Sequence, residues 1–129
     1  MKQDKLRSEM STVRGLGAAH DGTHHYIVQR VTAIALVPLV LWFVYSVICQ
    51  IGADYASFTA WLGSLHVATL MVLLIIATFW HAALGLQTVV EDYVHCHAMK
   101  IASLLAIKLG CFALAVAGIL SVLKIAFQA

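Results

Sequence analysis

The chain has 129 residues, of which 62% are hydrophobic and only 11% charged, with eight Lys and Arg against six Asp and Glu. This composition is too apolar for a small soluble domain, so the lipid bilayer is its expected environment, and a net charge of +2 is too small to indicate nucleic-acid binding. Two of the three cysteines fall in hydrophobic stretches, and no disulfide is expected.

Residues 1–24 form a polar arm ahead of the first hydrophobic stretch. The arm lacks the apolar run of a removable signal peptide. Its glycines predict irregular backbone, and they are Gly15, Gly17 and Gly22. We therefore expect a cytoplasmic arm at 1–24, followed by a single transmembrane domain at 25–129.

Three hydrophobic stretches follow, at about 28–51, 62–91 and 98–127. Each is long enough to cross a hydrocarbon core, which takes roughly 20 helical residues. Because backbone amides in lipid must be paired within the segment, each stretch is predicted to be a helix. The expected fold is an all-α membrane protein with three transmembrane helices. Pro38 is expected to bend the first of them.

The basic residues predict the orientation of these helices. Arg30 lies at the start of the first stretch and Lys100 near the start of the third, whereas the connection at 52–61 carries Asp54 and no basic residue. The positive-inside rule then places the N-terminus in the cytoplasm and the C-terminus in the periplasm.

His81 lies within the second stretch, which has no Asp, Glu, Lys or Arg between Leu62 and Val90. At 100° per residue it shares one helical stripe with Gly85, Thr88 and Asp92. Three roles fit a histidine at this depth: a hydrogen bond across a helix interface, a proton relay, and ligation of a haem iron. Gly85 either leaves room for a flat macrocycle or permits close helix packing.

Ligation by two imidazoles would need a second histidine at similar depth. The other histidine within a stretch is His66, which lies on the same helix, about 22 Å along it from His81, and cannot bind the same iron. The second ligand would therefore come from another polypeptide or another copy of this chain. His66 itself fits an interfacial position better than a second haem site.

The cytoplasmic end of the second stretch carries Glu91, Asp92 and Tyr93. A phenol here can donate a hydrogen bond to a quinone carbonyl, and a carboxylate can orient it or pass protons. The same residues also fit an ordinary helix end, with Tyr93 in the aromatic belt.

Two further features have no assigned function. His95, Cys96 and His97 are of metal-ligand type, but neighbouring residues at a helix end rarely converge on one ion. Lys108, inside the third stretch, is expected to extend toward the cytoplasmic head groups or to pair with a lipid phosphate.

Two motifs carry a resemblance to a known family. His81, Gly85, Asp92 and Tyr93 follow the pattern H-x3-G-x6-D-Y, which resembles the second helix of the small hydrophobic membrane anchor of bacterial succinate dehydrogenase (complex II). The segment 24–34, HHYIVQRVTAI, is similar to the family's H-x5-R-x-T-A-I entry to the first helix. Length, three-helix topology and orientation agree with this family as well.

The resemblance implies a role for each matching residue. His81 would supply one axial ligand to a haem b whose other ligand comes from a companion cytochrome b anchor protein. Tyr93 would donate to a ubiquinone carbonyl with Asp92 in support, and Arg30 and His24 would lie near the haem propionates. The expected partners are this companion anchor, the iron–sulfur and flavoprotein subunits, and membrane lipids, in the bacterial inner membrane. The chain would be part of an enzyme and would perform no succinate chemistry itself.

Two other functions remain open at this point. A quinol:fumarate reductase uses similar parts in the reverse direction. A small homo-oligomeric transporter or proton channel, which is a different class of protein, would use His81 and Asp92 to line a conduction path.

Overall fold

The computed structural model describes residues 19–128, with side chains from Thr23 onward, and within that range it contains four α-helices and no strand. They are α2 (Ala19–Cys49), α3 (Tyr55–Gly63), α4 (Leu65–Tyr93) and α5 (His97–Gln128). Helices α2, α4 and α5 are long and apolar enough to cross a membrane. The predicted all-α fold with three candidate transmembrane helices is therefore confirmed, while residues 1–18 of the predicted arm lie outside the described range.

The start of the first helix differs from the prediction. Helix α2 begins at Ala19 and includes Gly22, so the backbone there is helical where we predicted irregular structure. A single glycine inside a helix costs only about 1 kcal/mol relative to alanine, which a long apolar helix can outweigh. Gly15 and Gly17 lie outside the described residues.

A short helix that the sequence did not predict, α3, precedes the second transmembrane helix and contains the residues expected to open it. Asp54 caps α3, because its Oδ1 accepts a hydrogen bond from the Ser57 amide at 3.1 Å. The side-chain and backbone hydrogen bonds of Ser57 hold the pKa of Asp54 below its ordinary value. The helix ends at Ser64, whose backbone is extended and whose hydroxyl donates to the Trp61 carbonyl at 2.6 Å.

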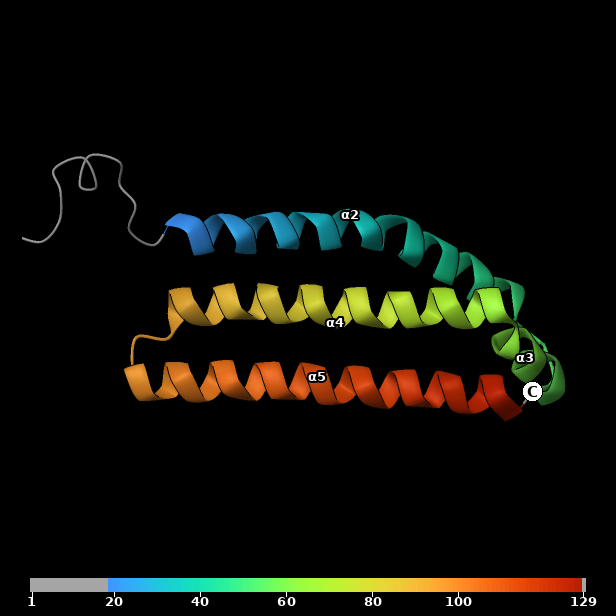
Figure 1. Cartoon of the computed structure of the whole chain (residues 1–129). Helices are drawn as coiled ribbons and strands as arrows, with labels where there is room; N and C mark the ends of the chain where they lie inside the picture. Colours follow the sequence, from blue (N-terminus) through green and yellow to red (C-terminus); the bar gives the residue numbers. More distant parts are fainter. Residues whose placement is uncertain (1–18, 129) are drawn as a thin grey trace, which may run out of the picture.

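Helix α4 lies between α2 and α5 in a flat layer, and neighbouring long helices run antiparallel (Figure 1). Both outer helices pack on α4, whereas the described residues of α2 and α5 do not pack on each other. Helix α3 packs on α5 and α4 at the end near the C-terminus. Helix α2 curves over its C-terminal half in Figure 1, in agreement with the bend expected from Pro38.

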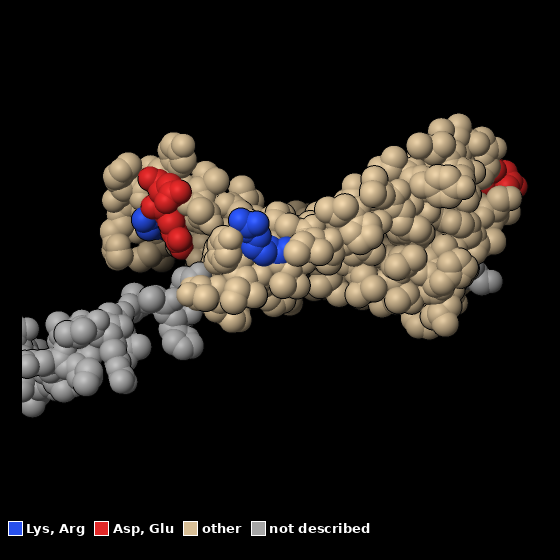
Figure 2. Space-filling view, turned by 90° about the horizontal axis from the view of Figure 1, so that it is seen from above, with Lys and Arg blue, Asp and Glu red and all other residues tan. Residues whose placement is uncertain are grey.

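The flat arrangement leaves a thin core. Among the described residues the buried apolar side chains are Leu62, Val67, Ala68, Leu74 and Val122. Large apolar side chains are exposed along all three long helices, and Figure 2 shows a long stretch without charged atoms between the blue atoms and the red atoms at the far right end. Most of this surface therefore needs lipid or another polypeptide against it.

Candidate functional site

His81 lies on the central helix and faces α2. Its side chain is half-buried, and its Nδ1 lies 3.0 Å from the Thr32 hydroxyl of α2. No described residue hydrogen-bonds Nε2 of the ring. One ring nitrogen is thus held by the neighbouring helix, and the other is available to a ligand.

Gly85, one turn after His81, also faces α2. A Cβ built on it would lie 3.6 Å from Nε2 of the Gln29 amide, which is an ordinary contact distance. The Gln29 side chain therefore lies over Gly85, while its Oε1 is buried without a hydrogen-bond partner. Within this chain alone, sterics do not require glycine at this position.

The predicted stripe divides into two halves. His81 and Gly85 contact α2, whereas Thr88 and Asp92 are exposed. The Thr88 hydroxyl donates to the Leu84 carbonyl of its own helix at 3.2 Å. The four residues share an angular position on α4, but the structure brings only the first two against another helix.

The end of α4 presents Asp92 and Tyr93 at the surface. Tyr93 is the last helical residue and its side chain is 78% exposed. The residue before this pair, Glu91, is held twice: its carboxylate accepts from Gln87 at 2.7 Å and its carbonyl accepts from Lys100 Nζ at 2.8 Å. The sequence identified Lys100 only as a positive charge, whereas the structure shows that it ties the start of α5 to the end of α4.

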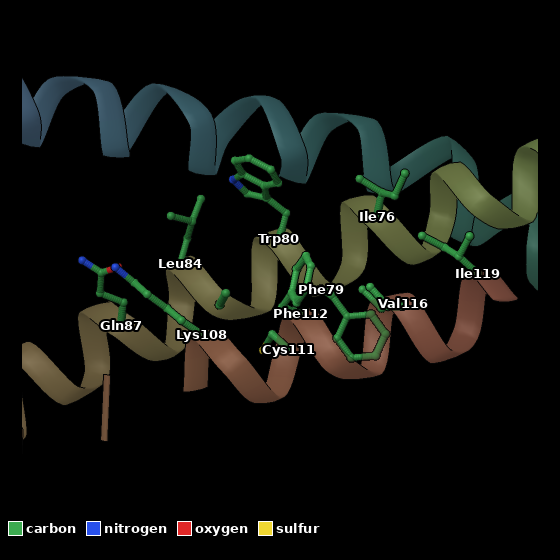
Figure 3. A pocket seen from close by; sticks show the side chains of 12 residues that line it. Ile76, Phe79, Trp80, Leu84, Gln87, Lys108, Cys111, Phe112, Val116 and Ile119 are labelled. Carbon is green, nitrogen blue, oxygen red and sulfur yellow. The ribbon is translucent and has the colours of Figure 1, made fainter. Parts of the chain in front are cut away.

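Two adjoining cavities lie on one face of α4. The more polar one, of about 510 Å³, is lined by His24 and His25 of α2 and Glu91 of α4, together with apolar side chains such as Val28. The other, of about 450 Å³, is apolar and lies between α4 and α5. Trp80, Leu84, Gln87 and Lys108 line both cavities, and Figure 3 shows Lys108 extending toward Gln87 of α4.

The two residues predicted to lie near haem propionates are in different surroundings. His24 lines the polar cavity, next to His25, whose buried Nε2 has no hydrogen-bond partner. Arg30 is exposed and does not line either cavity; its guanidinium lies 5.0 Å from the centroid of the Tyr26 ring. His25 is therefore a polar group of this cavity that the sequence reasoning did not single out.

The described histidines and cysteines do not gather into a metal site. Among residues 23–128, whose side chains the structure describes, no group of three or more His, Cys, Asp or Glu could hold an ion. In the connection after α4, His95 Nδ1 instead lies 3.1 Å from the Tyr93 carbonyl oxygen. His66 is exposed near the start of α4, at the opposite end from Tyr93.

Known proteins resemble the chain over most of its length. The family model described as succinate dehydrogenase/fumarate reductase transmembrane subunit matches residues 4–120. Among curated proteins, the succinate dehydrogenase hydrophobic membrane anchor subunit of Rickettsia bellii is 32% identical over 81% of this chain and 83% of its own length. The protein of the same name from Rickettsia conorii is 28% identical over 87% and 90%, respectively.

A third relative comes from another genus. The succinate dehydrogenase hydrophobic membrane anchor subunit of Paracoccus denitrificans is 30% identical over 74% of each chain. No solved structure gives a significant match. The match from residue 4 to residue 120 includes all of α2, α3 and α4 and most of α5, so the chain belongs to the succinate dehydrogenase membrane anchor subunit family.

Proposed function

We propose that this chain anchors a succinate:quinone oxidoreductase in the bacterial inner membrane, supplies one axial ligand of a haem b through His81, and forms part of a ubiquinone-reduction site with Tyr93 and Asp92. Family membership supports the anchoring role, and makes the chain an integral multi-pass subunit of an enzyme complex. The residue roles go beyond the family assignment and rest on geometry.

The observation that carries the haem proposal is the environment of His81. Its Nδ1 is held at 3.0 Å by Thr32, and its Nε2 has no partner among the described residues. A metal-bound histidine typically has this arrangement, in which the second ring nitrogen is hydrogen-bonded to the protein. Bound at such a site, haem b supplies one-electron transfer within the membrane.

Another polypeptide must complete the site. Within the described residues, His66 lies on the same helix about 22 Å from His81, and His25 lies seven residues before Thr32 on α2, about 10 Å along that helix from the contact with His81. Large apolar side chains are also exposed along all three long helices. We propose that the companion cytochrome b anchor supplies the missing axial ligand and packs against one face of the layer. The iron–sulfur and flavoprotein subunits would attach at the cytoplasmic end.

Tyr93 and Asp92, at the end of α4, are our candidates for the quinone contact and its proton supply. They lie twelve and eleven residues after His81, which is about 16–18 Å along α4. The exposed Tyr93 hydroxyl can donate to a quinone carbonyl, and the exposed carboxylate of Asp92 can take protons from water and pass them on. His24 and Arg30 remain our candidates for holding the haem propionates, with His24 lining a cavity about 510 Å³ in volume.

The comparisons favour succinate oxidation over the two alternative functions, fumarate reduction and a homo-oligomeric channel. The matching family model includes fumarate reductase subunits, whereas the relatives from Rickettsia and Paracoccus are named for succinate dehydrogenase. We therefore propose succinate oxidation as the physiological direction. A homo-oligomeric channel has no such support, and Asp92, which it would require along a conduction path, is exposed at the end of α4.

Substitution of His81 tests the haem proposal. In the assembled, purified complex, His81→Ala is expected to abolish the b-type band of the reduced-minus-oxidised spectrum. His66→Ala is the matched control, because it removes an exposed histidine from the same helix and should leave the band intact. Absence of haem from the wild-type complex, or an unchanged band in His81→Ala, would refute the proposal.

A further inference from the structure

The Thr32 hydroxyl touches three polar atoms but has one proton to donate. Its Oγ1 lies 2.9 Å from the Val28 carbonyl oxygen, 3.0 Å from the Gln29 carbonyl oxygen and 3.0 Å from His81 Nδ1. Carbonyl oxygens only accept hydrogen bonds, whereas an imidazole nitrogen either donates or accepts. The position of the single hydroxyl proton therefore determines which form of His81 is present.

The two carbonyls settle where that proton lies. If Thr32 donated to His81, its oxygen would face two carbonyl oxygens at about 3 Å with no hydrogen between them, which is repulsive. If Thr32 donates to its own backbone, the contact with His81 is a hydrogen bond from Nδ1–H to the threonine oxygen. Only the second arrangement places the hydroxyl proton toward the two carbonyl oxygens and a second proton between Nδ1 and Oγ1.

Other threonines of this chain show the same preference. The hydroxyls of Thr59, Thr69 and Thr88 each donate to the carbonyl four residues earlier, at 3.0, 2.7 and 3.2 Å, and none of them contacts an imidazole. Donation to the preceding turn is thus the ordinary state of a helical threonine here. Thr32 differs only in having an imidazole on the remaining side of its oxygen.

We infer that Thr32 is a positioning residue that fixes His81 in the Nδ1–H tautomer and holds its ring, leaving the Nε2 lone pair for iron. This inference rests on the proposed function, because it concerns His81 as a ligand. The protonated nitrogen of a neutral imidazole cannot bind a metal, so the alternative tautomer would present the wrong nitrogen. The contact joins residues 49 positions apart, which couples the ligand to the packing of α2 on α4.

The test compares substitutions at Thr32 in the assembled complex. Thr32→Val keeps the shape and removes the hydroxyl, whereas Thr32→Ser keeps the hydroxyl. We expect Thr32→Val to weaken haem binding about ten- to hundredfold, the usual effect of losing a hydrogen bond to a metal ligand. We also expect altered electron paramagnetic resonance g values and haem midpoint potential. Thr32→Ser should restore all three properties.

Thr88→Val is the matched control, because it removes a backbone-bonded threonine hydroxyl from the helix that carries His81. It should leave haem affinity and spectra unchanged. Thr32→Ala provides a second variant without the hydroxyl, should Thr32→Val fail to assemble.

Two results would overturn the inference. One is wild-type haem affinity and spectra in a variant that lacks the hydroxyl. The other is an equal loss of haem affinity in Thr32→Val and Thr32→Ser, which would show that the packing of the side chain matters and its hydroxyl does not. Both results are distinguishable from failure of the proposed function, in which the wild-type complex lacks haem or His81→Ala retains the haem band.

Discussion

The contact between Lys100 and the end of α4 makes a sharp prediction about the proposed quinone site. Lys100 Nζ donates to the Glu91 carbonyl at 2.8 Å, and so ties the first turn of α5 to the last turn of α4. This bond satisfies a carbonyl that has no partner within its own helix and places a positive charge at the negative end of the helix dipole. Lys100→Met should loosen the turn that carries Tyr93.

The expected size of the effect follows from the exposure of the contact. A hydrogen bond from a charged donor contributes about 1.5–3 kcal/mol when shielded. This one is exposed, so solvent screening reduces it to about 0.5–1 kcal/mol. That free energy corresponds to a change of roughly two- to fivefold in the opening equilibrium of the last turn.

Hydrogen exchange of the assembled complex measures this opening. Backbone amides near Tyr93 should exchange two- to fivefold faster in Lys100→Met, and Lys100→Arg should largely restore their protection. Lys124→Met is the control, because Lys124 is exposed at the opposite end of α5 and makes no described hydrogen bond. Unchanged exchange in Lys100→Met, or an equal change in the control, would show that the contact does not order this end.

Two further predictions concern the quinone contact and the packing of α4 on α5. Tyr93→Phe should slow succinate-driven quinone reduction about tenfold, because a hydrogen bond to the substrate is lost, while reduction of an artificial acceptor is retained; equal loss of both activities would indicate misassembly. Gly118→Leu should destabilise the complex by about 1–3 kcal/mol in thermal unfolding, because even a Cβ added at this glycine would lie 3.3 Å from Cδ1 of Ile75. Gly110→Leu is the control, since nothing lies within 4 Å of its Cβ position, and an equal loss of stability would contradict the packing argument.

The transmembrane helices were predictable because their length and hydropathy leave no other structure in lipid. Helix α3 was not, because its sequence is apolar and runs almost directly into α4. Its start depends on the cap at Asp54, and its separation from α4 depends on the extended backbone at Ser64, whose hydroxyl donates to the Trp61 carbonyl. Hydropathy cannot distinguish such a capped helix from the first turns of a longer one.

For the site, helical geometry predicted which residues share a face of α4 but not what that face meets. His81 and Gly85 both face α2, whereas Thr88 and Asp92, at the same angular position, are exposed. The contact of His81 with Thr32 depends on how far α2 is shifted along α4, and one sequence does not encode that register in any local pattern. The family-like segment 24–34 contained Thr32, yet gave no reason to connect it with His81.

The position of α4 in the layer explains why the proposed site is shared. Helices α2 and α5 cover two opposite sides of α4, so the sides between them remain open to a neighbour. His81 uses the α2 side to fix one ring nitrogen, and Tyr93 lies beyond the end of that contact, 78% exposed. A third long helix wrapped around α4 would have closed the open sides and left no approach for a second axial ligand. The flat layer keeps α4 accessible, and for this reason the ligand that completes the His81 site is expected from a separate polypeptide packed against this chain.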